Sequence, residues 1–229
     1  MNILPGIKIV DLGLFIEKHK ILIISDLHLG IEASLNKQGY LIPRFQFDEI
    51  KTRLKKILEK VDPKTIIFNG DLKHEFGSID RQEWNQILEL FDSLKDKKII
   101  VIEGNHDKIL EPITKKRNLK IEERYDIDNI TVIHGDYIPE KLNKIIIIGH
   151  EHPAISFPDR PDERYKCFLK GKYKNHDLLV TPSFSFLSQG TDIKRENLLS
   201  PFLQQSLKDF EIYVVEDKVY KFGKLTNTF

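Results

Sequence analysis

The chain has 229 residues, 40% of them hydrophobic, so it can bury one good core but is too short for two typical enzyme domains. Lys and Arg together number 36 and Asp and Glu 35, a balance that excludes the overall basic charge of a dedicated nucleic-acid binder. The single cysteine, Cys167, cannot form an internal disulfide, which is typical of the reducing interior of a cell. The longest apolar runs, such as residues 145–148, are far shorter than a membrane span, and residues 1–10 lack a secretory signal pattern. We therefore expect a single domain over residues 1–229, located in the cytoplasm and not in a membrane.

Five short apolar runs, rich in Ile and Val, each lead into a cluster of Asp, His, Asn or Gly. Runs of this length that are apolar throughout predict strands buried on both faces. In chain order, the clusters lie at Asp26, Asp71, Asn105, His134 and His150.

Two helices are expected between the first three strands. Apolar residues recur at three- and four-residue steps over residues 47–61 and again over 84–94, where Ser78 and Asp80 can cap the start of the second helix. The alternation of strand and helix is typical of parallel pairing with helices on the sheet faces. The first three clusters should therefore share the carboxyl edge of one sheet, where open α/β sheets bind ligands.

The rest of the chain favours strands. Short apolar and alternating segments predict them at residues 165–174, 178–180, 211–215 and 218–222. We expect the first two to pair like a hairpin and the last two to flank a turn at 216–217. These strands should form a second sheet packed on the first, giving an α/β sandwich. Residues 181–206, with their Pro, Ser and Gly residues, have no clear assignment.

The first two clusters offer carboxylates and an imidazole. Asp26 and His28 are two residues apart, so on an extended segment both side chains would point to one side and could hold one metal ion. Asp71 adds a carboxylate after Gly70, which allows a tight exit from the strand. Each pattern alone also fits an ordinary surface turn.

The later clusters are more specific. Asn105 offers a neutral carbonyl ligand and the adjacent His106 can face a substrate, although a loop with a capping Asp would fit the same letters. A lone histidine at a strand end, such as His134, is usually structural. His150 and His152 place two imidazoles on one side and form a ready metal clamp. Six of the 8 histidines fall in these clusters, which makes chance placement very unlikely.

Taken in order, the clusters resemble the signature of the calcineurin-like metallophosphoesterases, which runs D-x-H, GD, GNH[DE], H, GHxH. All of these elements are present between Asp26 and His152. The resemblance implies a four-layer α/β/β/α sandwich of two mixed β-sheets flanked by helices. It also implies two divalent metal ions as cofactors. Mixed oxygen and nitrogen ligands suit manganese or iron, while zinc or nickel would compete on affinity, and manganese is the expected metal.

The resemblance further implies a role for each site residue. One metal would be held by Asp26, His28, Asp71 and His152. The other would be held by Asp71, Asn105, His134 and His150, so that Asp71 bridges the pair. Two cations about 3.5 to 4 Å apart can share a hydroxide nucleophile and offset charge on the phosphate oxygens. His106 would be the general acid or would orient the phosphate.

The letters after Asp71 indicate the branch of the family. The protein-phosphatase branch has GD-x-x-D-R-G and GNHE, whereas this chain has GDLKH and GNHD. The GD-x-x-H form, with His74, resembles the phosphodiesterase branch, which includes the double-strand-break repair nuclease and the phosphoesterases associated with DNA ligases. The residues after His152 predict closing strands and not a DNA-capping domain, so the compact ligase-associated type and its archaeal relatives match better. The candidate catalytic residues are thus His106, Asn105 and His74, with a purely structural role for His74 as the alternative.

Three hypotheses for function follow. The first is a phosphodiesterase that acts on nucleotides or on accessible nucleic-acid ends, and the second is a phosphomonoesterase for small metabolites. The third is a non-catalytic protein-binding module, but such members of the family tend to lose ligands that this chain retains. Basic stretches at residues 51–56 and 115–117 could contact nucleic acid, although a charge run on a helix is usually a solvated surface.

Overall fold

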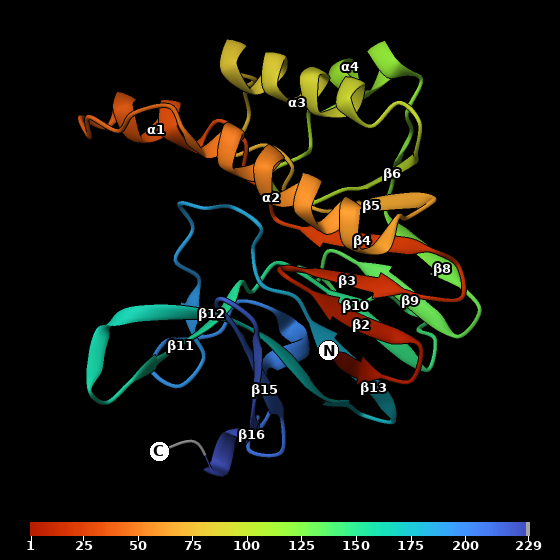
Figure 1. Cartoon of the computed structure of the whole chain (residues 1–229), viewed down its shortest axis with the longest axis vertical. Helices are drawn as coiled ribbons and strands as arrows, with labels where there is room; N and C mark the ends of the chain where they lie inside the picture. Colours follow the sequence, from red (N-terminus) through yellow and green to blue (C-terminus); the bar gives the residue numbers. More distant parts are fainter. Residues whose placement is uncertain (228–229) are drawn as a thin grey trace.

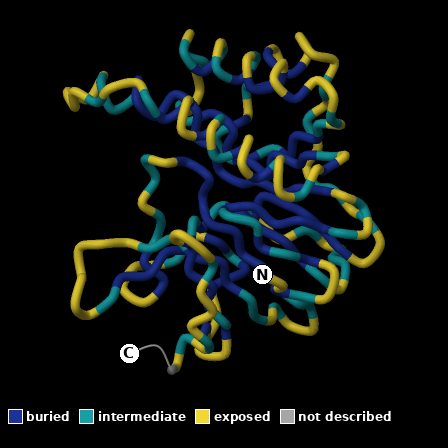
Figure 2. Tube along the Cα trace, in the orientation of Figure 1, coloured by how far each residue is buried: buried dark blue, intermediate teal, exposed yellow. Residues whose placement is uncertain are grey.

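Two mixed β-sheets pack face to face, and helices cover the outer face of the first sheet (Figure 1). This computed structural model describes residues 1–227. The apolar side chains between the sheets come from both of them and form one core, for example Ile23 and Phe68 from the first sheet and Val132 and Ile147 from the second. Figure 2 shows that the buried residues are concentrated in these central strands. The predicted fold class, two mixed sheets flanked by helices, is therefore confirmed.

The first sheet runs in chain order from β1 to β7. Its strands are β1 (Asn2–Leu4), β2 (Ile7–Val10), β3 (Gly13–Ile16), β4 (Ile21–Ser25), β5 (Thr65–Asn69), β6 (Lys98–Ile102) and β7 (Ile121–Glu122). Strands β1 to β4 pair antiparallel, whereas β4 to β7 pair parallel. The predicted parallel pairing of the first three apolar runs is confirmed, so β4, β5 and β6 end at the same edge of the sheet.

Four helices lie in the first half of the chain: α1 (Ile31–Lys37), α2 (Gln46–Val61), α3 (Arg81–Ser93) and α4 (Glu111–Thr114). Helix α2 buries Phe47, Ile50, Leu54 and Ile57, which recur at the three- and four-residue steps of one helix face. Asp80 caps α3, and Glu83 completes a capping box by returning a hydrogen bond to the cap backbone. Both predicted helices are confirmed.

The second sheet contains nine strands. They are β8 (Arg124–Ile127), β9 (Ile130–Ile133), β10 (Ile145–Ile148), β11 (Pro153–Phe157), β12 (Arg160–Tyr173), β13 (His176–Val180), β14 (Thr191–Asp192), β15 (Glu211–Val215) and β16 (Val219–Lys224). The hairpin-like pairing of β12 with β13 and the pairing of β15 with β16 are both confirmed as antiparallel. Strands β9 and β10 are parallel neighbours, so the loops that follow them leave the same edge.

The outer face of the second sheet carries a thin fourth layer. Within the described residues, this layer consists of the 3-10 turn η2 (Pro201–Leu203) and the irregular chain around it, and Leu225 of the 3-10 turn η3 (Leu225–Asn227) packs on the same apolar cluster. Phe202, Leu203, Leu207 and Phe210 pack there against sheet residues that include Ile146. A long helix is not needed on this face, because these few side chains already bury its apolar surface.

None of the helices in the described part of the chain has the length and apolar character needed to cross a membrane.

Candidate metal centre

The loops that follow β4, β5, β6, β9 and β10 converge at one edge of the sandwich. The N–H of Asp26 donates to the carbonyl of Gly70 at 3.2 Å, which joins the loops after β4 and β5. The N–H of His150, in the second sheet, donates to the carboxylate of Asp26 at 3.1 Å. The N–H of Gly149 also donates to the carbonyl of His134, at 2.8 Å. Residues more than 100 positions apart in the sequence are thus held against one another at this edge.

The backbone at this edge is strained at several of the predicted ligands. Left-handed φ values between 43° and 63° occur at Asp26, His28, Asp71, His150 and His152. Non-glycine residues avoid this region at a cost of about 1–2 kcal/mol each, and such strain collects at functional sites. The sequence-based expectation that the first two of these residues lie on an extended segment is wrong. Their side chains still face one cluster, because the left-handed turns aim them there.

The first group of potential ligands combines two carboxylates with two imidazoles. Nε2 of His152 lies 3.4 Å from Oδ1 of Asp26 and 3.3 Å from Nε2 of His28. The same His28 nitrogen lies 3.8 Å from Oδ2 of Asp71. One ligand atom from each of the four residues lies within 4.8 Å of all the others. This group coincides with the residues expected for one metal.

The second group lies around the imidazole of His134. Its Nε2 lies 3.5 Å from Oδ1 of Asp71, 3.0 Å from Oδ1 of Asn105 and 3.1 Å from Nδ1 of His150. These are the residues expected for the other metal. The two oxygens of Asp71 therefore face different groups, with Oδ2 towards His28 and Oδ1 towards His134.

The electrostatics of the cluster fit bound cations. Burial, and then the neighbouring charge of Asp26, raise the pKa of Asp71 to about 9, and burial raises the pKa of Asp26 well above its usual range. Burial also lowers the pKa of His28 and His134 well below the usual histidine value. Buried carboxylates next to neutral imidazole nitrogens are a favourable set of donors for divalent metals. The residues present thus fit the two cations that the resemblance implies.

His74 and His106 lie beside the first group. Nδ1 of His74 lies 3.4 Å from Nδ1 of His28, on the side of that ring away from Asp71. Nδ1 of His106 hydrogen-bonds the carbonyl of His74, and its Nε2 lies 3.8 Å from Oδ2 of Asp71. Both rings are half-buried, so they border the cluster on its open side. The structure therefore brings together every site residue expected from the sequence.

Two glycines are required by close contacts at the centre. A Cβ on Gly104 would lie 2.2 Å from the backbone nitrogen and Oδ1 of Asp71, and a Cβ on Gly70 would lie 1.9 Å from the ring of His134. A side chain at either position would push a potential ligand out of place. Glycine is needed here for the approach of neighbouring groups as well as for the turn.

Asp107 is buried and stabilises the loops of the centre, whereas the sequence suggests it only as a capping residue. Its carboxylate accepts hydrogen bonds from the N–H of Leu72 and from the N–H of Gly104, both at 3.1 Å. It thereby clips the loop after β5 to the loop after β6. Burial raises the pKa of Asp107 to about 7, although these backbone donors favour its charged form. The last letter of GNHD was the signal for this role.

Residues 181–206, which have no clear assignment from the sequence, form hydrogen bonds that hold the residues of the centre in place. Oγ of Ser183 donates to the carbonyl of Asp26 at 2.7 Å, and Oγ of Ser188 lies 3.2 Å from Nδ1 of His152. Gln46, at the start of α2, donates to the carbonyl of His28 at 3.1 Å and accepts from Oγ of Ser185. No local pattern in the sequence marks these residues, because their partners are far away along the chain.

Comparison with known proteins agrees with this geometry. The family model described as calcineurin-like phosphoesterase matches residues 19–212. Among solved structures, the chain is similar to the nuclease MPE of Pseudomonas putida, with a TM-score of 0.68 and 17% identity over 91% of this chain and 90% of that one. It is also similar to the phosphoesterase YfcE of E. coli, with a TM-score of 0.41 and 13% identity over 86% and 88% of the two chains. A comparison with curated proteins gave no significant match. Because the family model covers most of the sequence, the chain belongs to the calcineurin-like phosphoesterase family.

Proposed function

We propose that this phosphoesterase is a dinuclear-metal-dependent phosphodiesterase that hydrolyses nucleotide or nucleic-acid phosphodiester bonds. The observation that carries the proposal is the position of Asp71, whose two oxygens face two separate groups of potential ligands. Two cations held on one carboxylate would lie close enough together to act on the same phosphate group. The letters GDLKH, which match the phosphodiesterase branch, support a diester as the substrate.

Each cation would have ligands of mixed chemistry. One would bind Asp26, His28, Asp71 and His152, and the other would bind Asp71, Asn105, His134 and His150. When bound, the cations would activate the attacking water and offset the negative charge of the phosphate oxygens. Oxygen and nitrogen ligands in these proportions favour manganese in our proposal, with iron, zinc and nickel as the competitors.

His106 is the proposed proton donor to the leaving oxygen. Its Nδ1 donates to the carbonyl of His74, which leaves Nε2 facing the side of Asp71 where a phosphate would bind. Burial lowers the pKa of His106 to about 4 in the free protein. In the proposal, a proton on Nε2 hydrogen-bonds the bound phosphodiester and is passed from there to the leaving oxygen.

His74 is proposed as a positioning residue. Its ring lies 3.4 Å from Nδ1 of His28 and its carbonyl accepts from His106, so it contacts one potential metal ligand and the proposed acid. A histidine that binds metal through Nε2 carries its proton on Nδ1, where a partner fixes the orientation of the ring. His74 can be that partner for His28.

Nucleic acid is the first substrate class to test. The nuclease MPE is named for cleaving nucleic acid, and although its likeness to this chain shows the fold alone, it gives a reason to begin there. We place the activity in the cytoplasm, because the single cysteine is buried and free.

The test compares purified protein with and without manganese on a bis-aryl phosphate diester, the matching aryl monoester and a dinucleotide. We expect diester hydrolysis that depends on manganese, and its loss in Asp71→Ala. The control is Asp209→Ala, which removes an exposed carboxylate that pairs with Lys224, far from the centre. Turnover that survives in Asp71→Ala would sink the proposal, and a faster rate on the monoester would favour the metabolite phosphatase instead.

A further inference from the structure

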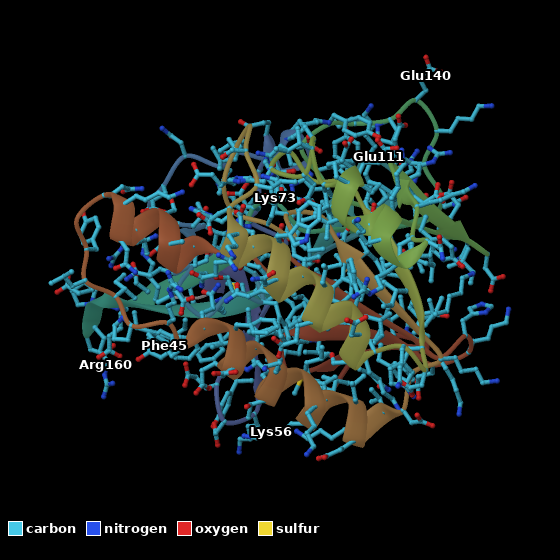
Figure 3. The ribbon with its side chains drawn as sticks, turned by 90° about the horizontal axis from the view of Figure 1, so that it is seen from above. Phe45, Lys56, Lys73, Glu111, Glu140 and Arg160 are labelled. Atoms are coloured by element: carbon cyan, nitrogen blue, oxygen red, sulfur yellow. The ribbon has the colours of Figure 1, made fainter. Side chains whose placement is uncertain are left out.

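Phe76 places an aromatic ring directly on the proposed proton donor. It lies on the irregular connection between β5 and α3, three residues after Lys73, which is labelled in Figure 3. The centroid of its ring lies 3.6 Å from that of His106, with 33° between the planes. The ring of His74 is a second neighbour of the His106 ring, at a centroid distance of 5.7 Å and 24° between the planes. The proposed acid therefore contacts Phe76 more closely than it contacts His74.

The backbone around Phe76 is anchored, so the direction of its ring is defined. The buried carboxylate of Glu83 accepts from the N–H groups of His74 and Glu75, at 3.1 and 2.7 Å, and from the N–H of Asp80 at 2.8 Å. Gly77 follows with a positive φ of 66° and turns the chain away. Both ends of the short segment are therefore fixed.

The outer face of this ring is open to solvent. Phe76 is 60% exposed, although a phenylalanine gains about 25 cal/mol for each Å² of apolar surface that it buries. One face covers His106 and the rest has no apolar neighbour in the described part of the chain that would bury it. A planar group bound at the centre could cover this surface.

We propose that Phe76 is a specificity-determining residue that stacks on the planar group carried by the leaving oxygen, a nucleobase or an aryl ring. This inference rests on the proposed function, because the proton from His106 must reach the leaving oxygen. The group attached to that oxygen must then lie beside the stacked pair of His106 and Phe76, where the exposed edge and outer face of Phe76 are within its reach. Stacking of bases on aromatic rings tolerates any base, since every base has a π face. Phe76 has no hydrogen-bonding group, so it favours a planar leaving group without selecting which base.

The experiment uses two dinucleotides that differ only in the base of the leaving nucleoside. One has a thymine there and the other an abasic sugar, so the leaving alkoxide is the same. Both polarities are tested, because the products show whether the 3′ or the 5′ oxygen leaves. The variants are Phe76→Ala, Phe76→Trp and the control Phe222→Ala, which removes an exposed aromatic ring on β16 that is 39% exposed and packs on Phe157.

For Phe76→Ala we expect kcat/KM on the thymine substrate to fall about tenfold, mainly through KM, and kcat/KM on the abasic substrate to change less than about twofold. Phe76→Trp should restore the difference between the substrates, and Phe222→Ala should leave both rates unchanged. If Phe76 only shields or orients His106, Phe76→Ala will lower kcat equally on both substrates and shift the pH profile, which overturns the inference. An unchanged rate on both substrates overturns it too.

A binding measurement separates this inference from the proposed function. Analogues of the same dinucleotides in which a methylene group replaces the leaving oxygen cannot release the leaving nucleoside, and their dissociation constants can be measured by calorimetry with manganese present. We expect the base-bearing analogue to bind about tenfold more tightly than the abasic one, and this preference to vanish in Phe76→Ala. Wild-type protein that binds with this preference but cleaves no dinucleotide would contradict the proposed function alone. Equal affinity for the two analogues would contradict the role of Phe76.

Discussion

The backbone N–H of His106 donates to Oδ1 of Asp71 at 3.0 Å, while the imidazole of the same residue lies 3.8 Å from Oδ2. One residue therefore touches both oxygens of the carboxylate that we propose as the metal bridge. The backbone contact fixes the carboxylate, and the side chain faces the place where a phosphate would bind. This relationship couples the proposed metal site to the proposed proton donor.

Metal binding should release protons. Burial and the charge of Asp26 raise the pKa of Asp71 to about 9, so in the metal-free protein this carboxyl is protonated at neutral pH. Burial lowers the pKa of His152 to about 4, so this imidazole is already neutral. A cation must displace the proton of Asp71, so its affinity should rise with pH until that carboxyl is ionised, at about pH 9. Calorimetry in two buffers of different ionisation enthalpy measures this release, and an affinity that does not vary with pH would contradict the account.

Loss of the His106 side chain should affect the reaction and spare the metals. His106→Ala is expected to lower kcat about 10²- to 10⁴-fold on dinucleotides, whose alkoxide leaving groups need a proton. On nitrophenyl diesters the loss should be much smaller, because nitrophenolate leaves without one. Metal content, measured by mass spectrometry, should stay at the wild-type value. An equal loss on both kinds of substrate would show that His106 is not the acid.

Asp107 should be needed for stability although it is no ligand. Asp107→Ala leaves the N–H groups of Leu72 and Gly104 buried without an acceptor, and should lower the free energy of unfolding by about 2–4 kcal/mol. Asp107→Asn keeps one carbonyl oxygen and should lose less. Urea unfolding of the metal-free proteins provides the measurement. If Asp107→Ala is as stable as wild type, the hydrogen bonds of Asp107 to the two loops do not contribute to the free energy of unfolding.

Ser188 should strengthen metal binding although it is not itself one of the proposed ligands. Its hydroxyl lies 3.2 Å from Nδ1 of His152 and can fix the ring so that Nε2 faces the cluster. Removal of such a partner typically weakens metal binding 10- to 100-fold, and we expect this for Ser188→Ala. Ser93→Ala, at the end of α3, is a matched control that should bind metal normally. Identical affinity of the two variants would argue against this role.

The sequence predicted those parts of the structure whose signals are local. Each buried parallel strand is a continuous apolar run, and helix α2 repeats its apolar residues at the helical period, so both could be recognised in short windows. The cluster could be predicted because the parallel strands β4, β5 and β6 bring their following loops to one edge. The sequence therefore predicts that Asp26 and Asp71 lie close together.

The parts that could not be predicted depend on distant contacts or have weak local signals. Strands β1, β2 and β3 are only three or four residues long, and α1 has Gly30 at its N-cap, which offers no side chain to cap it. Ser183 and Ser188 lie on irregular chain whose path is fixed by Asp26 and His152, more than 30 residues away in each case. No sequence motif marks Phe76, because the residue that its ring contacts, His106, lies on the loop after another strand.

The central claim is that Asp71 holds two cations at once, and a crystal grown with manganese tests it most directly. Anomalous scattering distinguishes manganese from the lighter atoms of protein and solvent. We expect two peaks at the cluster, one beside Oδ2 of Asp71 on the His28 side and one beside Oδ1 on the His134 side, and no peaks in Asp71→Ala. A single peak, or two peaks that Asp71 does not touch, would contradict it.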